Sequence, residues 1–404
     1  MNQLTNLLRK RGSTLFSVSC IFLFINYLVP QIGHSQCGET IVSTIAGTPG
    51  SESGDDGQGS VAGFYYPWDV DMDLSGNMIV ADPYNHNIRK ITPGGLVSTV
   101  AGLAETDGSA DGPSADARFY YPMGVAVGPQ GNIYVADTYN HSIRKITPDG
   151  MVTTFAGLSG SDGSADGSGS NARFYYPHAL AADGSGNIYV ADTYNSTVRK
   201  ITPAGMVTTL AGVAESEGSA DGTGSDARFD NPYGITVDDN GIIYVADSDN
   251  QTIRKVTPAG EVTTFAGMVG VDGSADGVGT AASFYNPYGV GMDANGNILV
   301  ADSYNHTIRS ITPAGIVSTI AGIVDQDGTA DGPGDEAEFY YPMGLGVDGN
   351  GDIIVADTYS HTLRKIECEY VSSNTQDLPA IGRWGLLLML FMVISIASTL
   401  LYRK

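Results

Sequence analysis

The stretch GNIYVADTYNHSIRKITPDG, residues 131–150, carries the pattern that decides the fold of this chain. Residues 133–136 form a nearly continuous apolar run, residues 141–146 alternate, and residues 147–150 read Thr-Pro-Asp-Gly. A continuous apolar run is typical of a strand buried on both faces, alternation is typical of a strand with one buried face, and Pro and Gly mark turns. The stretch therefore predicts two antiparallel strands bounded by short turns.

This pattern recurs at a fixed interval. Its Val-Ala-Asp element ends at residues 82, 137, 192, 247, 302 and 357, so each step is 55 residues. Each unit holds four strand-like runs, which in the second unit are residues 124–127, 133–136, 141–146 and 151–156. Six equal steps exclude a set of independent domains, and four antiparallel strands repeated around an axis form the blades of a β-propeller. We therefore expect an all-β, six-bladed β-propeller of four-stranded antiparallel blades over residues 37–370.

The turn within each unit resembles the motif that gives the NHL family its name. The resemblance is carried by Tyr139-Asn140-His141-Ser142-Ile143-Arg144, and it recurs at residues 84–86, 304–306 and, with Ser360 in place of Asn, 359–361. The corresponding sites at residues 194–196 and 249–251 lack the histidine. The resemblance covers about 330 of the 404 residues and implies a six-bladed propeller.

The order of the strands predicts how the ring closes. The first outer-strand sequence, residues 41–47, precedes every inner strand, and the last inner set, residues 344–366, has no outer strand after it. The N-terminal strand is therefore expected to complete the final blade, which removes the exposed edges of an open fan. Antiparallel pairing brings Cys37 and Cys368 together, so we predict a disulfide formed in an oxidising compartment. Two unrelated free thiols are the alternative.

The N-terminal end, residues 1–35, has the pattern of a secretory signal peptide. Arg9, Lys10 and Arg11 precede an apolar run over residues 15–29, and small residues follow near Ser35. The alternative is a retained membrane anchor, but the run is short for a span of roughly 20 residues. We expect an exported protein.

The C-terminal end, residues 378–404, is expected to anchor the chain in a membrane, after a linker over residues 371–377. Its apolar stretch, residues 385–401, is closed by Arg403 and Lys404, which favour the cytoplasmic side. The order of Pro379, Trp384, apolar helix and basic end also resembles IPTL-CTERM sorting signals, although an acidic residue before the Trp is missing. That resemblance implies removal by an envelope enzyme, so the propeller is placed in the cell envelope or at the cell surface, anchored or released.

The charge of the chain restricts its partners. It has 20 Lys and Arg against 44 Asp and Glu, a net charge of −24, which excludes nucleic acid as the expected partner. Most cations between the two ends occupy repeated third-strand positions such as Arg144. Each second strand ends on an acid such as Asp137, so the repeated cations are predicted to pair with repeated carboxylates.

Each long loop between units carries two acidic residues four positions apart. The pairs are Glu52/Asp56, Asp107/Asp111, Asp162/Asp166, Glu217/Asp221, Asp272/Asp276 and Asp327/Asp331. Carboxylates beside glycine turns suit Ca²⁺, although the spacing differs from that of an EF-hand loop. Asp-Gly is equally typical of a tight turn. Both interpretations stay open, and calcium is the only cofactor that the sequence suggests.

Positions that vary within the repeat are the candidates for ligand specificity. One set follows the recurring proline and lies near the mouth of the central channel: Trp68, Met123, His178, Tyr233, Tyr288 and Met343. A second set precedes the proline: Tyr66, Tyr121, Tyr176 and Tyr341, with Asn231 and Asn286 in the other two units. Together they predict an aromatic, acid-rimmed pocket for a peptide, glycan or cation on the long-loop side. Packing between blades is the alternative.

The sequence favours a binding protein over an enzyme. Some NHL relatives are lyases with a zinc held by histidines near the channel, but here only His178 falls outside the repeated turn and the signal region. No Gly-x-Ser-x-Gly or His-Glu-x-x-His motif is present. We expect a noncatalytic, monomeric scaffold for an extracellular or periplasmic protein, peptide or glycan. The alternative is a lyase or lactonase-like enzyme with a metal in the channel.

Overall fold

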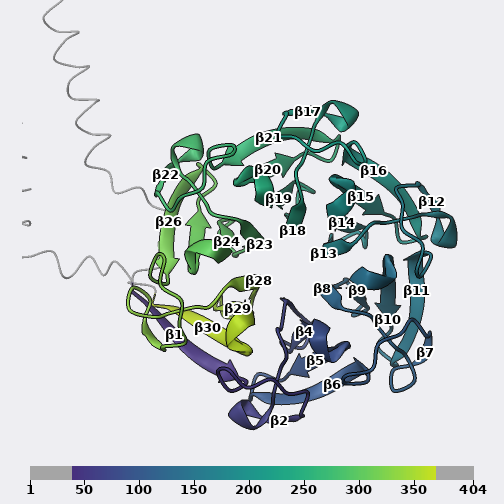
Figure 1. Ribbon diagram of the computed structural model, residues 1–404, viewed down its shortest axis with the longest axis horizontal. Helices are drawn as coiled ribbons and strands as arrows, with labels where there is room; N and C mark the ends of the chain where they lie inside the picture. Colours follow the sequence, from purple (N-terminus) through teal and green to yellow (C-terminus); the bar gives the residue numbers. More distant parts are fainter. Residues whose placement is uncertain (1–38, 370–404) are drawn as a thin grey trace, which may run out of the picture. The chain divides into compact units, whose positions relative to one another are not determined.

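The computed structural model describes residues 39–369, which form six antiparallel sheets arranged around a central axis (Figure 1). These residues contain β-strands and short 3₁₀ turns but no α-helix. The predicted all-β, six-bladed propeller is therefore confirmed. Each blade has five strands rather than the predicted four.

The second blade shows the origin of the extra strand. From the channel outward it contains β8 (Pro122–Val127), β9 (Ile133–Asp137), β10 (Ser142–Ile146), β11 (Met151–Gly157) and β7 (Gly112–Pro113). The two-residue β7 belongs to the long loop that enters the blade, and it pairs with the start of β11. A two-residue strand is too short to produce a periodic signal, which is why the four-strand prediction was wrong.

Four other blades repeat this order. From inner to outer, blade 1 contains β3 (Asp69–Met72), β4 (Met78–Asp82), β5 (Asn87–Ile91), β6 (Leu96–Gly102) and β2 (Gly57–Gln58). Blade 3 contains β13 (Pro177–Ala182), β14 (Ile188–Asp192), β15 (Thr197–Ile201), β16 (Met206–Gly212) and β12 (Gly167–Ser168). Blade 4 contains β18 (Pro232–Val237), β19 (Ile243–Asp247), β20 (Thr252–Val256), β21 (Glu261–Ala266) and β17 (Gly222–Thr223). Blade 5 contains β23 (Pro287–Met292), β24 (Ile298–Asp302), β25 (Thr307–Ile311), β26 (Ile316–Ala321) and β22 (Gly277–Val278).

Blade 6 joins the two ends of the described chain. Its order is β28 (Pro342–Val347), β29 (Ile353–Asp357), β30 (Thr362–Glu369), β1 (Glu39–Ala46) and β27 (Gly332–Pro333). The first strand thus completes the last blade, as predicted (Figure 1).

Several predictions about the ends fall outside the described residues. These are the signal peptide at residues 1–35, the linker and anchor at residues 371–404, and the disulfide, because Cys37 is not described. The backbone of Cys368 pairs with that of Thr40. Within residues 39–369 we find no helix of the length and apolarity needed to cross a membrane.

The hydrophobic core lies between neighbouring blades. One cluster joins Ile143 and Ala156 of blade 2 to Phe174, Val190 and Ile201 of blade 3, and all five side chains are fully buried. Because each blade completes the core of the next, the six units form one cooperative ring rather than separate domains.

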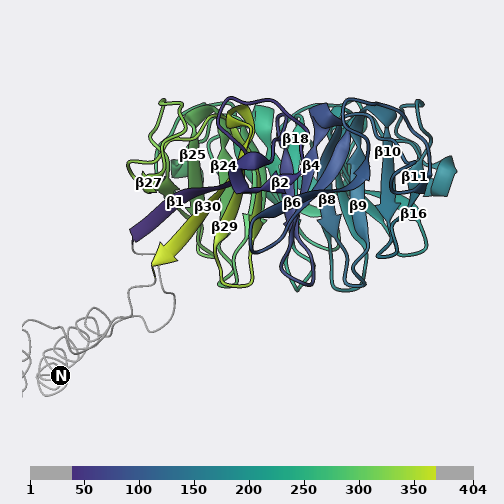
Figure 2. The same ribbon diagram turned by 90° about the horizontal axis from the view of Figure 1, so that it is seen from below.

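The ring has two different faces (Figure 2). The long-loop face carries the 3₁₀ turns after the second strands, such as η3 (Thr138–Asn140), and the ends of the long loops. These segments meet where the Tyr139 N–H donates to the Tyr120 carbonyl at 3.1 Å. The short-turn face carries the hairpin turns between first and second strands, such as residues 128–132.

Candidate functional site

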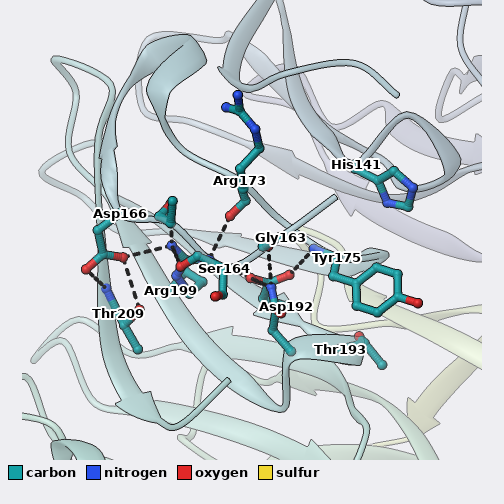
Figure 3. A network of polar contacts seen from close by, with 12 residues as sticks. His141, Gly163, Ser164, Asp166, Arg173, Tyr175, Asp192, Thr193, Arg199 and Thr209 are labelled. Atoms are coloured by element: carbon teal, nitrogen blue, oxygen red, sulfur yellow. Dashed lines mark hydrogen bonds and ion pairs between the residues drawn. The ribbon is translucent and has the colours of Figure 1, made fainter. Parts of the chain in front are cut away.

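A buried arginine in every blade fixes the long loop to the sheet. In blade 3, Arg199 is fully buried and donates through Nη1 to Asp192 at 2.6 Å and through Nη2 to Asp166 at 2.8 Å (Figure 3). Nη1 also donates to the carbonyl of Arg173 in the loop at 3.0 Å. We call this set of six, one per blade, the arginine network: Arg89, Arg144, Arg199, Arg254, Arg309 and Arg364.

The carboxylate inside each network is satisfied from several sides. Asp192 accepts hydrogen bonds from the backbone of Tyr175 at 2.8 Å and from the Asn195 amide at 2.8 Å, besides Arg199 (Figure 3). Burial raises the pKa of the equivalent Asp137 to about 6, and the attraction of Arg144 opposes that rise. Charged partners and full hydrogen bonding explain how these acids stay buried. The predicted pairing of repeated cations and carboxylates is present in all six blades.

The second acid of each long-loop pair belongs to the arginine network. In blade 2, Asp111 accepts hydrogen bonds from Arg144 at 2.6 Å and from the Thr154 hydroxyl at 3.2 Å, while its side chain stays about half exposed. Four of the eight calcium candidates share this arrangement, each with the arginine of its own blade: Asp111, Asp166, Asp276 and Asp331. The structure thus gives these four a role that differs from the calcium ligation suggested by the sequence. Because each of these carboxylates is hydrogen-bonded to a buried guanidinium group of the sheet, they hold the loop on the sheet.

The first acid of each pair is not a partner of the network arginine, and in four pairs it lies near the motif histidine of the preceding blade: Glu52, Asp107, Asp162 and Asp327. Glu52 shows this placement, with its carboxylate 3.9 Å from Nε2 of His361. The remaining calcium candidates are the corresponding acids Asp107, Asp162, Asp272 and Asp327. Across residues 39–369, His, Cys, Asp and Glu side chains nowhere gather in a group of three that could hold a metal. Calcium binding by these loops stays an untested prediction.

The motif histidines link neighbouring blades. The Nδ1 atom of His86 accepts the backbone N–H of Tyr121, in the next blade, at 3.2 Å. Burial lowers the pKa of His86, which keeps this nitrogen an acceptor. Equivalent bonds join His141 to Tyr176, His306 to Tyr341, and His361 to Tyr66. The sequence placed these histidines in a ring, but their role as interblade acceptors was missed.

A glutamine replaces the histidine between blades 4 and 5. Gln251 accepts the backbone N–H of Asn286 at 2.6 Å and donates to its side-chain oxygen at 2.8 Å. The same interblade link is therefore made by a group that does not titrate.

The partly exposed tyrosines before the recurring prolines pack against tyrosines of the 3₁₀ turns and form an aromatic surface with them. Tyr121 lies between Tyr84 and Tyr139, with ring centroids 4.9 and 4.8 Å away, and Tyr176 continues the series 4.9 Å from Tyr139. The tyrosines of the 3₁₀ turns, Tyr84, Tyr139, Tyr194 and Tyr359, are 37 to 44% exposed. We call this arc on the long-loop face the tyrosine belt: Tyr304, Tyr341, Tyr359, Tyr66, Tyr84, Tyr121, Tyr139, Tyr176 and Tyr194.

The tyrosine belt is interrupted between Tyr194 and Tyr304. Asn231 and Asp249 of blade 4 and Asn286 of blade 5 occupy the positions of three tyrosines, and the Asn231 amide donates to Asp249 at 2.6 Å. Burial, followed by repulsion from Asp249, raises the pKa of the nearby Asp230 carboxyl. The belt is thus an open arc with an acidic gap.

The residues after the prolines lie deeper and line a cavity. All six predicted candidates, Trp68, Met123, His178, Tyr233, Tyr288 and Met343, line a central cavity of about 710 Å³, here called the channel cavity. The structure therefore separates the ten candidates: these six surround the channel, whereas Tyr66, Tyr121, Tyr176 and Tyr341 belong to the belt.

Four rings from different blades converge across the channel. The Trp68 ring lies 6.3 Å from that of Tyr288 and 6.4 Å from that of His178. Tyr233 contacts both His178 and Tyr288, at 4.6 and 4.4 Å. The rings come from blades 1, 3, 4 and 5, so they form a lopsided aromatic cap, whereas blades 2 and 6 contribute Met123 and Met343.

Two acidic residues in the channel wall were missed from the sequence. Asp69 accepts the backbone N–H of Val125 at 3.0 Å, and Asp71 accepts that of Val127 at 2.7 Å, across the seam between β3 and β8. Both line the channel cavity. Their register positions hold only small or uncharged residues in the other units: Gly124, Ala179, Gly234, Gly289 and Gly344 for Asp69, and Ala126, Ala181, Thr236, Gly291 and Gly346 for Asp71. Aligning the units column by column gives the signal that would have found them.

Comparison with known proteins finds similarity in the repeated segments. Five segments, residues 119–146, 174–201, 229–256, 284–309 and 339–366, match the model described as NHL repeat. NHL repeat-containing protein 2 from Homo sapiens is 29% identical over 340 residues, covering 75% of this chain and 47% of that protein. The chain thus spans about half the length of the curated relatives it matches.

Solved structures share the ring. A protein of unknown function from Bacteroides thetaiotaomicron superposes with a TM-score of 0.64 at 23% identity, over 81% of this chain and 76% of its own. An auxiliary nutrient binding protein from Bacteroides ovatus gives a TM-score of 0.62 at 17% identity, over 82% and 77%. At these identities the likeness shows the fold alone. The described part of the chain is a six-bladed β-propeller, and five of its six units contain a segment that matches the NHL repeat.

Proposed function

We propose that this protein is an exported, noncatalytic binding scaffold whose long-loop face holds a peptide, protein or glycan against the tyrosine belt. The observation that carries the proposal is the belt itself. The side chains of neighbouring belt tyrosines lie about 5 Å apart around most of the propeller, as between Tyr139 and Tyr176 at 4.9 Å. Tyr84, Tyr139, Tyr194 and Tyr359 nevertheless remain exposed. Contiguous exposed aromatic surface marks interaction sites on soluble proteins.

The chemistry of the belt restricts the ligand. Each tyrosine offers an apolar ring face together with a hydroxyl that donates and accepts hydrogen bonds. Such surfaces suit sugar rings and proline or aromatic side chains. The acids of the long loops, such as Asp107 and Asp162, and the gap at Asp249 surround the belt with negative charge. Neutral or cationic ligands are therefore favoured over phosphate or sulfate groups.

The structural neighbours offer general support. Two of them, from Bacteroides ovatus and Bacteroides thetaiotaomicron, are named auxiliary nutrient binding proteins. Proteins of this fold that are named for nutrient binding are consistent with the binding role proposed for this chain.

Array binding followed by calorimetry tests the proposal. The full chain is applied to neutral glycan and peptide arrays, and the best ligand is then titrated in solution. Replacing Tyr84 and Tyr139 with Ala removes the two exposed belt rings on either side of Tyr121 and is expected to weaken binding about tenfold. The matched control is Leu74→Ala, because Leu74 is 73% exposed and lies on the short-turn face. Equal affinity in the tyrosine double variant would contradict the proposal.

Export is a further part of the proposal, and it rests on the sequences of residues 1–35 and 378–404. Mass spectrometry of the mature chain from fractionated cells is expected to find a new N-terminus near Ser35. The C-terminal mass distinguishes a retained anchor from a released protein. A chain that keeps Met1 and stays in the cytoplasm would contradict export.

The channel-metal enzyme has less support. The channel cavity contains one histidine, His178, whereas catalytic zinc commonly needs three protein ligands. Metal analysis of the full chain tests this alternative, and stoichiometric zinc would favour it over the noncatalytic scaffold.

A further inference from the structure

The channel cavity leads away from the tyrosine belt. Its lining begins at the aromatic cap of Trp68, His178, Tyr233 and Tyr288 and continues to turn residues of the short-turn face, such as Asp239. No belt tyrosine is among the lining residues. The cavity is therefore a second concave surface, which opens toward the opposite face of the ring.

The lining is acidic throughout. It includes six carboxylates, at Asp69, Asp71, Asp238, Asp239, Asp293 and Asp348. Among the described residues that form this wall there is no Lys or Arg. Clefts lined by charges of one sign focus the electrostatic potential and concentrate ligands of opposite sign. The ligand class that fits such a wall is cationic.

Asp69 and Asp71 bring two of these charges deep into the channel wall. They accept hydrogen bonds from backbone N–H groups, those of Val70 and Val125 for Asp69 and those of Met72 and Val127 for Asp71. Burial raises the pKa of Asp69 to about 7, and the charge of Asp71 contributes to that rise. A bound cation would favour the ionised form of both acids.

His178 presents a hydrogen-bond acceptor at the wall of the cavity, in addition to the two acids. Its side chain lines the cavity and is only 7% exposed. Nδ1 lies 2.9 Å from the Tyr176 carbonyl, so Nδ1 carries the hydrogen and Nε2 is an acceptor. Within residues 39–369, no group donates a hydrogen bond to Nε2. Burial lowers the pKa of His178 to about 4, so the ring is neutral near pH 7.

We propose that the channel cavity binds an organic ammonium or guanidinium group, which enters from the short-turn face and lies between the acids of β3 and the aromatic cap. Asp69 and Asp71 neutralise the charge, His178 accepts an N–H, and Trp68 and Tyr288 offer ring faces to the cation. The aromatic cap distinguishes this ligand from a metal ion, which would need several oxygen or nitrogen ligands at one point. The cavity volume of about 710 Å³ suits a small molecule or a single basic side chain.

Calorimetry with matched probes tests the proposal. The full chain is titrated with argininamide and with citrullinamide, which has the same shape but an uncharged side chain. Argininamide is expected to bind and citrullinamide to bind at least about tenfold more weakly. Spermidine and a capped Gly-Arg-Gly peptide distinguish a free amine from a basic side chain as the source of the cation. No heat with any cationic probe, or equal affinity for citrullinamide, would overturn the proposal.

Variants locate the binding in the channel. Asp69→Asn is expected to weaken argininamide binding about tenfold, whereas Asp149→Asn, an equal charge change at an exposed turn outside the cavity, leaves it unchanged. If Asp69→Asn unfolds the seam between β3 and β8, Asp239→Asn at the cavity rim replaces it and is expected to weaken binding as well. Equal effects of the cavity and control variants would overturn the proposal, because binding would then follow net charge alone.

His178→Phe separates hydrogen bonding from ring contact. It keeps an aromatic ring but removes Nε2, so argininamide should bind more weakly while tetramethylammonium, which has no N–H, keeps its affinity. Equal losses for both probes would overturn the role given to Nε2. The proposal is also independent of the belt: Tyr84→Ala with Tyr139→Ala should leave argininamide binding intact, even where belt binding fails.

Discussion

The arginine network and the channel wall use the six repeats in opposite ways. The network repeats the same arginine, the same two aspartates and the same buried phenylalanine in every blade, as Arg199 does over Phe174 at 5.2 Å. The wall changes from blade to blade, with Trp68, Met123 and His178 at equivalent positions. Positions that must hold a loop on a sheet are the same in every unit, whereas positions that face the channel are free to differ. The residues that hold the loops on the sheet are therefore distinct from those proposed to bind a ligand.

The largest expected effect is on the network. Arg199→Ala leaves Asp192 buried without its cation, and such losses cost about 3–5 kcal/mol. Thermal or urea unfolding of the full chain measures the change. Arg173→Ala is the matched control, because the Arg173 side chain bonds nearby loop carbonyls, those of Ser170 and Ala172. If Arg199→Ala lowers the free energy of unfolding by less than about 1 kcal/mol, the stabilising role given to the arginine network is contradicted.

The next largest effect on stability is expected in blade 6, where the two ends of the described chain meet. The predicted Cys37–Cys368 disulfide would contribute about 2–4 kcal/mol by restricting the unfolded chain. Cys368→Ser is expected to lower the unfolding temperature, and reductant should lower that of the natural protein but not that of the variant. Non-reducing peptide mapping that finds both thiols free would contradict the prediction.

The interblade histidines predict a smaller, pH-dependent effect. Burial lowers the pKa of His86, His141, His306 and His361 from the usual 6.5. Below 6.5 the unfolded chain therefore binds more protons, and stability from these groups is lost as the pH falls toward their folded values. Each broken link is worth about 1 kcal/mol.

Glutamine at the four histidine positions isolates this contribution. The chain already uses Gln251 for the same link, so the fourfold His→Gln variant should fold. The difference in stability between natural protein and variant cancels the opposing titration of the buried aspartates. That difference should change as the pH falls below 6.5, and a pH-independent difference would count against the interblade role.

The smallest expected effect on stability comes from filling the gap in the belt. Asn231→Tyr with Asp249→Tyr extends the aromatic arc through blade 4 as far as Asn286, and Tyr121 already adopts the same left-handed backbone, with φ of 47° against 48° at Asn231. Stability should change by about 0.5 kcal/mol or less, while affinity for a neutral belt ligand rises. If the double variant does not fold, Asn231 and Asp249 are needed for the stability of the propeller.

Much of the fold could be predicted because repetition amplifies weak signals. A single short strand gives little information about the fold. The apolar run at residues 133–136 recurs in all six units and predicts the ring, and the unmatched outer strand at residues 41–47 predicts how it closes. The two-residue outer strands, such as β7, form only through tertiary contacts and leave no periodicity to read.

The site was predicted in part, for the opposite reason. The varying positions after the prolines led to the channel cavity, as His178 and Tyr233 illustrate. Asp69 and Asp71 were missed because the search for shared patterns passes over a unit that departs from them. The division of the ten candidates between belt and cavity depends on depth along the channel axis, which a repeat alignment does not contain.

Ring closure has a mechanical consequence. β1 and β30 run antiparallel and pair Glu39 with Glu369, so the described chain enters and leaves the ring at the same corner (Figure 2). A force that pulls residues 39 and 369 apart loads the hydrogen-bonded pairs one after another, in the manner of a zipper, rather than all together in shear. Tension between residues 39 and 369 therefore separates β1, the strand that completes the last blade, from β30.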